Sequence, residues 1–517
     1  MLASLRSAAV VGLDALPVVV EVDVSIGLPV FTMVGLPDTS VRESRDRVRS
    51  AIRNSGYDFP GHRVTVNLAP ADVRKAGASY DLPIALGILA ASGIIEQRRI
   101  DHVVLLGELS LDGSIQPIRG VLPVAVAARR EGKSAILLPR ANAREARVVE
   151  GLRVLPVDSL AEAVHVLNRP LNEAAGDLAD RTAGEMSAVA GPAFSTTAAT
   201  DPQPDFADVA GQAMAKRALE VAAAGGHNIL LVGPPGGGKT MMARRLPSVL
   251  PPLEFDEALD CTSVHSVAGT LPPGAALMHV RPFRAPHHTI SEVAMVGGGS
   301  NPRPGEISLA HNGVLFLDEL PEFERRVLEA LRQPLEEGRV TVARSARTAS
   351  FPARFMLVAA MNPCPCGFHG DHRRACRCSP PQIHRYAGRI SGPLRDRIDL
   401  LVDVSAAGTG ASGAPREESS ATIRTRVIRA RGVQRRRFVA SGSRLNAGME
   451  GVMLREHCAL DRTAAKLLEA AIQKFCLSAR GCDRVLRISR TIADLEELPQ
   501  LNSGHLAEAL QYRVVFA

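Results

Sequence analysis

A glycine-rich segment restricts the possible folds more than any other part of the sequence. Residues 233–240 read Gly-Pro-Pro-Gly-Gly-Gly-Lys-Thr and fit the pattern G-x-x-x-x-G-K-[ST]. The apolar run Ile229–Val232 precedes the segment and the helix-compatible run Met241–Leu246 follows it, so strand, loop and helix stand in the order that a phosphate-binding loop needs. An incidental glycine-rich turn is the alternative, but it does not require these flanks. The segment therefore predicts a nucleotide-binding α/β domain.

Each residue type in this loop has a physical role in holding a nucleotide. The glycines let backbone N–H groups turn onto phosphate oxygens at a helix N-terminus. Lys239 is predicted to neutralise β- and γ-phosphate charge, and the hydroxyl of Thr240 to ligate Mg²⁺. The predicted ATP contacts are Gly233, Pro234, Pro235, Gly236, Gly237, Gly238, Lys239 and Thr240.

Two further apolar strands end in polar residues of a catalytic type. The run Val314–Leu317 is followed by Asp318 and Glu319. The run Phe355–Met361 is followed by Asn362. Asp318 is predicted to hold Mg²⁺, Glu319 to polarise the attacking water, and Asn362 to orient that water or the γ-phosphate. Either feature alone is also typical of a solvated strand end or a turn. Because the carboxyl ends of parallel strands meet at one edge of a sheet, the three segments together predict an ATPase.

The composition excludes a disordered chain, a membrane span and a disulfide-stapled fold. The chain has 517 residues, of which 46% are hydrophobic, enough for several domains with separate cores. No apolar run approaches the roughly 20 residues that a membrane span needs, so we expect a cytosolic protein without membrane contact. The net charge of +7 indicates an acidic partner only where it is concentrated.

Composition along the chain predicts three folded regions and one linker. Residues 1–170 alternate β-rich runs with helical stretches, which is typical of an α/β domain. Residues 171–205 are rich in small residues and carry six acids against one arginine, which predicts a flexible acidic linker. Residues 206–406 contain the nucleotide motifs. Residues 407–517 are mostly helical by periodicity.

Four clustered cysteines predict a structural metal site. They lie in a loop with almost no apolar residues, so hydrophobic burial cannot order the loop and another stabilising interaction is needed. Four thiolates close a tetrahedral Zn²⁺ site and leave no open position for catalysis. His369 and His372 are alternative ligands, and four free or redox-active thiols are an alternative interpretation. The predicted ligands are Cys364, Cys366, Cys376 and Cys378.

Two segments contain several arginines and no acid. The pattern of residues 339–355 predicts a β-hairpin with Arg344 and Arg347 near its tip. Residues 420–444 contain eight arginines, which would repel one another unless something anionic lies against them. A solvated face is the alternative for any such run, but nucleic-acid phosphates are the obvious candidate. Only Phe438 interrupts the second segment with an aromatic ring, so we expect backbone contact without base stacking, with Arg435, Arg436 and Arg437 as contacts.

The order of these motifs resembles that of a known ATPase family. The segments GPPGGGKT, VLFLDE, AAMNP and GPLRDRIDL follow one another as in the AAA+ ATPases of the magnesium-chelatase and MCM-helicase branch. Outside the linker, the whole chain resembles the ComM (YifB) family of Mg-chelatase-like ATPases. The resemblance implies an AAA+ core with a helical C-terminal lid, assembly into a hexameric ring, and a pore hairpin that grips DNA. It also implies that Arg397 is an arginine finger acting on a neighbouring subunit and that Arg480 is the sensor-2 arginine, with Arg484 as the second choice.

The N-terminal region resembles the Lon protease domain but lacks the lysine of its catalytic Ser–Lys pair. The segments 75–81 and 106–120 carry the resemblance, and Ser79 falls where Lon keeps its nucleophile. The position of the catalytic lysine is Leu122, and Ser–Lys chemistry needs an amine beside the hydroxyl. Lys75 is a weak substitute because it lies on the entering loop. We therefore expect an inactive domain that serves assembly or partner contact.

The leading hypothesis is an ATP-driven, ring-forming motor that moves on DNA. By resemblance, it would promote branch migration in natural transformation or recombination. ATP, Mg²⁺ and a structural Zn²⁺ are the expected cofactors, and DNA and further copies of the chain are the expected partners. The alternatives are a chelatase-type ATPase that remodels a protein partner, a Lon-like serine protease, and a non-enzymatic DNA-binding scaffold.

Overall fold

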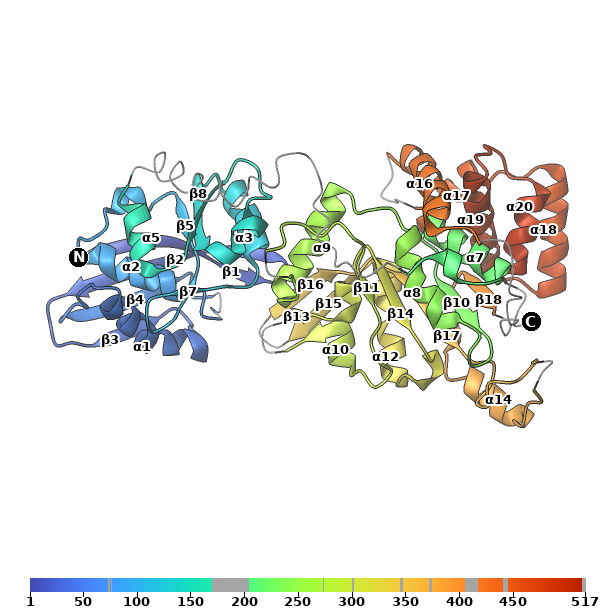
Figure 1. Ribbon diagram of the computed structural model, residues 1–517, viewed down its shortest axis with the longest axis horizontal. Coiled ribbons are helices and arrows are strands. Elements are labelled where there is room, and N and C mark those ends of the chain that lie inside the picture. Colours follow the sequence, from blue (N-terminus) through green and yellow to red (C-terminus); the bar gives the residue numbers. More distant parts are fainter. Residues whose placement is uncertain are drawn as a thin grey trace.

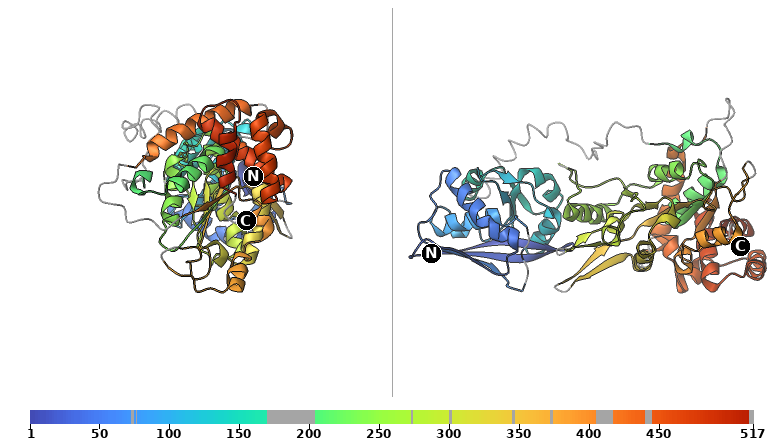
Figure 2. Two further views of the ribbon diagram at one scale, coloured as in Figure 1. Left: turned by 90° about the vertical axis from the view of Figure 1, so that its right-hand side faces the viewer. Right: turned by 90° about the horizontal axis from the view of Figure 1, so that it is seen from below.

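Three folded parts follow one another along the long axis of the computed structural model (Figure 1, Figure 2). The N-terminal part lies at one end, the C-terminal helices lie at the other, and a parallel sheet lies between them. The described residues are 1–72, 75, 77–169, 204–272, 274–299, 302–344, 347–371, 374–404, 417–439 and 445–513. Residues 171–203 of the predicted linker, His372 and Arg444 lie outside them, and the predicted domain boundaries stay predictions.

The N-terminal part is a mixed seven-stranded sheet in the order β3-β4-β2-β1-β5-β8-β9. Helices α1, α2 and α5 pack on one face, and α3 and α4 pack on the other. The run Leu82–Ala91 is apolar on all sides, so α2 is a buried helix. The elements are β1 (Leu2–Val11), β2 (Asp14–Ser25), β3 (Phe31–Val34), α1 (Thr39–Asn54), β4 (Arg63–Ala69), α2 (Asp81–Ala91), β5 (Val103–Leu105), β6 (Glu108–Leu109), β7 (Ile115–Gln116), α3 (Val121–Arg130), β8 (Ala135–Pro139), α4 (Ala143–Ala146), β9 (Arg153–Val157) and α5 (Leu160–Leu167).

The central part is built on a five-stranded sheet in the order β11-β14-β17-β10-β18, in which all neighbours are parallel. Strands β10, β14 and β17 are apolar and buried along their whole length, as parallel strands covered on both faces must be. The predicted α/β fold class is confirmed. The main elements are α7 (Ala213–Gly225), β10 (Ile229–Val232), α8 (Lys239–Val249), α9 (Phe255–Ala268), β11 (Phe283–Arg284), α10 (Glu292–Val296), α11 (Glu306–Leu309), β14 (Val314–Leu317), α12 (Arg325–Ala330), α13 (Arg332–Glu337), β17 (Met356–Met361), α14 (Pro380–Ala387), α15 (Gly392–Arg395) and β18 (Leu400–Asp403).

The predicted hairpin consists of β15 (Arg339–Arg344) and β16 (Arg347–Pro352). Its buried residues alternate along each strand, with Val340 and Val342 on one and Ala349 and Phe351 on the other. One face of the hairpin therefore packs on the core while the other faces outward. Arg344 pairs with Arg347 in the last register position, so both stand at the tip of the hairpin.

The C-terminal part is helical and shares a hydrophobic core with one face of the central sheet. Helices α16 and α19 pack on α7, and α16 also packs on α8. Among the described residues, no helix has both the length and the hydropathy to cross a membrane. The helices are α16 (Ser420–Arg437), α17 (Val452–His457), α18 (Arg462–Phe475), α19 (Ala479–Leu495) and α20 (Ser503–Gln511).

Among the described residues, the N-terminal part touches the central part at the hairpin and at α9. The tight turn between β1 and β2 touches the hairpin, because a Cβ added to Gly12 would lie 3.4 Å from the carbonyl oxygen of Ser350. The second contact joins α3 and α4 to α9, where Ser266 donates to the carboxylate of Glu145 and accepts from the N–H of Gly120 at 3.1 Å. The second contact is buried, so it shields Glu145 from water.

Candidate nucleotide and metal sites

The glycine-rich loop connects β10 to α8 at the carboxyl edge of the central sheet. Gly236 and Gly238 have φ values of 76° and 86°, a region in which a side chain would be strained. Lys239 is buried, and its Nζ donates to the carbonyl oxygens of Gly233 at 2.7 Å and Pro234 at 2.9 Å. Burial lowers the pKa of the Lys239 ammonium. The Lys239 side chain thus contacts the backbone of the same loop with which it is predicted to bind phosphates.

Polar residues from three strands converge beside this loop. The Oγ1 of Thr240 donates to Oδ2 of Asp318 at 2.6 Å. The Nζ of Lys239 donates to Oδ1 of Asn362 at 3.1 Å. A hydroxyl and a carboxylate in this proximity are hard oxygen donors of the type that Mg²⁺ prefers, so Thr240 and Asp318 fit the predicted Mg²⁺ site. The structure therefore brings these four side chains together, as we expected from the strand ends.

Glu319 has a neighbour that the sequence motifs did not reveal. Its backbone is strained, with a φ of 52°, and its side chain is 56% exposed. Nδ1 of His288 lies 3.4 Å from Oε2 of Glu319, and the ring of His287 lies against that of His288, tilted by 33° with 4.1 Å between centroids. These histidines follow β11, which lies beside β14 and is separated from β10 by β14 and β17. No spacing pattern links them to Glu319, and only the sheet order brings them together.

Arg397 and Arg480 lie at the opposite edge of the central sheet. Both line a cavity of about 1350 Å³. The same cavity is lined by Asn228, Gly313 and Met356, which stand at the amino ends of β10, β14 and β17. The two arginines are therefore separated by the sheet from the glycine-rich loop of their own chain.

The two candidates for the lid arginine differ in exposure. Arg480 is exposed in the first turn of α19. The side chain of Arg484 is 9% exposed, and its Nε lies 3.8 Å from Oδ1 of Asp399. Arg397 donates to the carbonyl oxygen of Pro393 at 2.6 Å and pairs with Glu336. Of the two lid candidates, Arg480 is the one that presents its side chain to solvent.

The four predicted cysteine ligands form one compact cluster. Their sulfur atoms all lie within 4.8 Å of one another. The Cys364–Cys366, Cys364–Cys376 and Cys366–Cys376 Sγ distances are 3.4, 3.7 and 3.6 Å. Tetrahedral Zn²⁺ with Zn–S bonds of about 2.3 Å requires sulfurs roughly 3.8 Å apart, so the cluster fits this ion. Among the described residues the cluster contains the cysteines alone, and His369 is exposed outside it.

The positive charge of the segment 420–444 is partly neutralised by acids from other parts of the chain, which corrects our expectation that nothing within the protein opposes it. Acids from distant parts of the chain pair with most of the arginines on α16. The guanidinium of Arg431 donates to the carbonyl oxygen of Ala223. Arg436 is exposed and makes no ion pair with any described residue. The pairs are Arg426 with Glu220 and Glu418, Arg429 with Glu497, Arg435 with Glu254, and Arg437 with Asp494.

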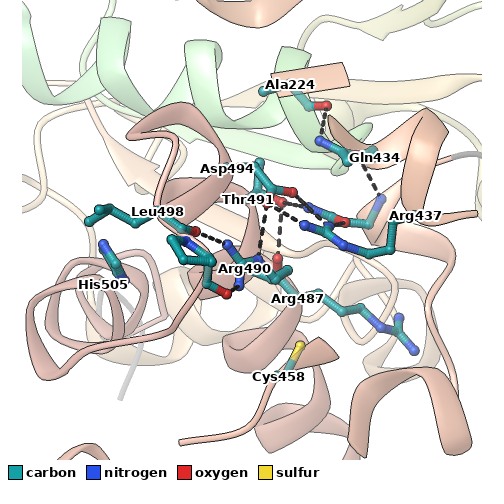
Figure 3. A network of polar contacts seen from close by, with 12 residues as sticks. Ala224, Gln434, Arg437, Cys458, Arg487, Arg490, Thr491, Asp494, Leu498 and His505 are labelled. Carbon is teal, nitrogen blue, oxygen red and sulfur yellow. Dashed lines mark hydrogen bonds and ion pairs between the residues drawn. The ribbon is translucent and has the colours of Figure 1, made fainter. Parts of the chain in front are cut away.

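Arg437 belongs to a buried network between α16 and α19 (Figure 3). Asp494 is fully buried and accepts from Arg437 at 2.8 Å and from Arg490 at 3.1 Å. Asn446 donates to the same carboxylate at 2.8 Å, and its own N–H donates to Gln434 at 2.9 Å. Arg437 therefore holds two helices together, and we remove it from the predicted DNA contacts.

The position of the Lon catalytic lysine is sealed inside the N-terminal part. Leu122 is fully buried in the first turn of α3, and its N–H donates to Oε1 of Glu145 at 2.9 Å. Burial raises the pKa of the Glu145 carboxyl. The Lys75 ammonium is buried and donates to the carbonyl oxygen of Pro70. The inactivity of this part stays a prediction.

Comparisons with known proteins cover nearly the whole chain. Residues 205–411 match the family described as magnesium chelatase, subunit ChlI. Residues 20–142 match subunit ChlI of Mg-chelatase, and residues 417–513 match the C-terminal part of the same subunit. The YifB protein of Salmonella typhimurium is 45% identical over 99% of this chain and 97% of its own length. The competence protein ComM of Haemophilus influenzae is 44% identical over 99% of this chain and 98% of its own length. The Lon protease of Chloroflexus aurantiacus is 29% identical over 29% of this chain and 20% of its own length.

Proposed function

The chain belongs to the ComM/YifB family of magnesium-chelatase-like AAA+ proteins, and we propose that it is an ATP-hydrolysing ring motor that acts on DNA. The ATPase activity is supported by the family and by one observation above all. Residues from three separate strands meet around a glycine-rich loop at one edge of a parallel sheet. That edge is where open α/β sheets bind their ligands.

The residues at this edge divide the chemistry of hydrolysis among them. The loop amides and Lys239 bind the phosphates. Thr240 and Asp318 hold Mg²⁺, which when bound neutralises charge that develops on the phosphates. Glu319 accepts a proton from the attacking water, and Asn362 orients that water or the γ-phosphate. Lys239 donates to two carbonyl oxygens of the loop and to Asn362, and its ammonium exchanges these partners for a phosphate when it binds the nucleotide.

Hydrolysis requires a second copy of the chain. Arg397 and Arg480 line a cavity at the far edge of the sheet, so they serve the nucleotide of a neighbouring copy. An arginine supplied across an interface stabilises the charge of the transition state and raises the rate of hydrolysis by about 10³-fold or more. Arg397 pairs with Glu336 of its own chain, and in the proposed ring the phosphates of the neighbour replace that partner. We propose a hexamer by analogy with the family.

DNA binding is proposed for the β15–β16 hairpin and for two arginines of α16. Arg344 and Arg347 stand at the hairpin tip, where a ring would place them in its pore. Arg435 and Arg436 are exposed on α16 and complete the proposed contacts. These residues bind phosphates, so the binding is independent of sequence and weakens as salt rises.

A role in natural transformation or recombination is the proposed context. One relative carries the name competence protein, and it matches this chain over 99% of its residues. We propose that the motor promotes branch migration when incoming DNA is joined to a homologous duplex. Ring closure around one strand would let each ATP hydrolysis move the hairpins along it.

A chelatase-type ATPase that remodels a protein partner is the second candidate. It is favoured by the three chelatase-subunit matches and by the pairing of the α16 arginines with acids, which reduces the free positive charge of that helix. Such an enzyme would hydrolyse ATP without responding to DNA. DNA stimulation of ATP turnover therefore separates the two candidates.

A structural Zn²⁺ is proposed for Cys364, Cys366, Cys376 and Cys378. The spacing of their sulfurs supports a tetrahedral thiolate site, and four protein ligands leave no position for substrate. The metal would staple the loop between β17 and α14, which carries few apolar side chains.

The decisive experiment measures ATP turnover by the full chain with no DNA, with single-stranded DNA and with forked DNA, at two stated salt concentrations. We expect turnover that rises with DNA, and a DNA affinity that falls with salt. Turnover without any response to DNA, together with no DNA binding, would overturn the DNA proposal and favour the chelatase-type candidate. No turnover under any condition would overturn the ATPase assignment.

A further inference from the structure

The loop that carries the four cysteines begins inside the nucleotide site. Strand β17 ends at Met361, and the next residue is Asn362, whose Oδ1 accepts from Nζ of Lys239 at 3.1 Å. Cys364 follows two residues later and is fully buried. The N–H of Gly367 donates to the carbonyl oxygen of Cys364 at 3.0 Å. A closed turn that contains two of the cysteines therefore starts beside the residue predicted to face the γ-phosphate.

The same turn presses on the glycine-rich loop. A Cβ added to Gly367 would lie 2.5 Å from Cδ and 2.7 Å from Cγ of Pro235. The backbone of Gly367 thus packs directly on the proline ring, with no room for a side chain between them. The loop also meets the end of β18, because a Cβ on Gly233 would lie 2.1 Å from the carbonyl oxygen of Val404, the residue that follows this strand. The phosphate-binding loop therefore contacts both the end of β18 and the cysteine turn.

Few other contacts hold the cysteine turn in position. Among the described residues from 363 to 379, Cys364 and Gly367 are the only ones that are buried. A segment with so little apolar burial does not order itself against its conformational entropy. Four thiolates around one metal ion supply the missing energy, because metal binding and ordering of the loop are then the same event.

We propose that the metal bound by the four cysteines is a structural part of the ATP site, so that nucleotide affinity depends on metal occupancy. The proposal rests on the Zn²⁺ and ATP assignments made above. The metal ties Cys364 and Cys366 to the distal pair of cysteines, and this fixes Gly367 against Pro235. A glycine-rich loop that is already held in position loses less entropy when it closes on phosphates, and its affinity for them is higher.

The first test compares the full chain with a C376S/C378S double variant. Bound zinc is measured by elemental analysis, and affinity is measured by equilibrium binding of a fluorescent ATP analogue with Mg²⁺, so neither reading depends on turnover. We expect the variant to lose zinc and its nucleotide Kd to rise about tenfold or more, since small displacements of positioning groups have effects of that size. Loss of zinc with an unchanged Kd would overturn the proposal.

The second test leaves the cysteines intact and separates contact from backbone strain. Gly367 and Gly370 lie in the same loop with φ values of 85° and 79°, so alanine strains both backbones alike. Only Gly367 touches the phosphate-binding loop, because a Cβ on Gly370 would meet nothing within 4 Å. We expect Gly367→Ala to keep its zinc and bind the analogue more weakly, and Gly370→Ala to keep both properties. Equal nucleotide affinities in the two variants would overturn the proposal.

The wild-type chain distinguishes a failure of this proposal from a failure of the proposed function. A chain that binds the analogue but contains no zinc overturns the metal assignment and this proposal, and leaves the ATP site in place. A chain that contains zinc but binds no nucleotide overturns the ATPase assignment itself.

Discussion

The two α/β parts of this chain differ at the positions where a catalytic side chain is expected. In the central sheet, strands end in Asp318 and Asn362, whose side chains meet an open glycine-rich loop. In the N-terminal part, the position that would supply a catalytic amine is the fully buried Leu122 of α3. The nearby carboxylate of Glu145 accepts hydrogen bonds from the N–H of Leu122 and from the hydroxyl of Ser266 in the central part. We interpret the first sheet as a chemical scaffold and the second as a docking scaffold.

The difference lies in the contacts that the polar groups of each part make. At the central site, Lys239, Thr240, Asp318 and Asn362 pair with one another beside the loop, and a bound nucleotide with Mg²⁺ would exchange these contacts for its own. In the N-terminal part, the buried carboxylate of Glu145 instead accepts from Ser266 of the central part and so belongs to the contact between the two parts. We propose that hydrolysis takes place in the central sheet alone, and the following predictions test this proposal.

The largest effect is expected for the arginine at the far edge of the central sheet. Arg397→Ala should lower ATP turnover by about 10³-fold or more, because a guanidinium at the γ-phosphate is lost. Mixing this variant with Lys239→Ala subunits should restore part of the turnover, because some interfaces then combine an intact loop with an intact arginine. Turnover is measured for each variant alone and for mixtures. Mixtures that stay inactive would place Arg397 outside a shared site.

The next effect separates the two sheets directly. Glu319→Gln should lower turnover by about 10²- to 10⁴-fold while nucleotide still binds, because a general base is replaced by an amide of the same shape. Ser79→Ala is the matched change in the N-terminal part and should leave turnover unchanged. The measurements are steady-state hydrolysis and equilibrium nucleotide binding. Normal turnover by Glu319→Gln, or a defect of Ser79→Ala, would break the comparison.

A third prediction concerns stability and uses neighbouring arginines of α16. Arg437→Ala should lower the free energy of unfolding by on the order of 3 kcal/mol, because it leaves the buried Asp494 with fewer partners. Arg436→Ala should change stability little, since its exposed side chain has no ion pair among the described residues. Thermal and urea unfolding of both variants give the comparison. Equal stability of the two variants would contradict the network in Figure 3.

The smallest effect is expected where the two parts meet. Ser266→Ala removes a hydrogen bond to the buried Glu145 and should loosen the docked N-terminal part by about 1–2 kcal/mol. Ser263→Ala on the same helix is the control, because its hydroxyl donates only to the carbonyl oxygen of Leu259 in that helix. Hydrogen exchange of the amides of α3 and α9 reports the loosening. Equal exchange in the two variants would show that the contact carries no docking energy.

Local patterns were sufficient for much of the fold and for one edge of the site. The strands β10, β14 and β17 were identified from apolar runs, and the order of loop, Asp318 and Asn362 predicted their meeting. The hairpin and the position of its two tip arginines were also found from the sequence, because alternation and turn position are local properties. The four cysteines lie close in sequence, so their cluster followed from spacing.

Other features of the site depended on sheet order and could not be predicted. His288 reaches Glu319 because β11 lies beside β14, a neighbour relation that no motif encodes. The placement of Arg397 and Arg480 at the amino edge of the sheet came from the packing of α15 and α19. The contact of Gly367 with Pro235 joins residues far apart in the chain.

The sequence by itself determined the nucleotide motifs, the family and the fold class, because each rests on residues that are neighbours in the chain or on an order of such segments. The tertiary structure alone decided how charge is distributed. Residues 420–444 have no acid of their own, yet Glu220, Glu254 and Asp494 reach their arginines from other elements. The Coulomb energy depends on distance in space and on burial, and neither is fixed by distance along the chain.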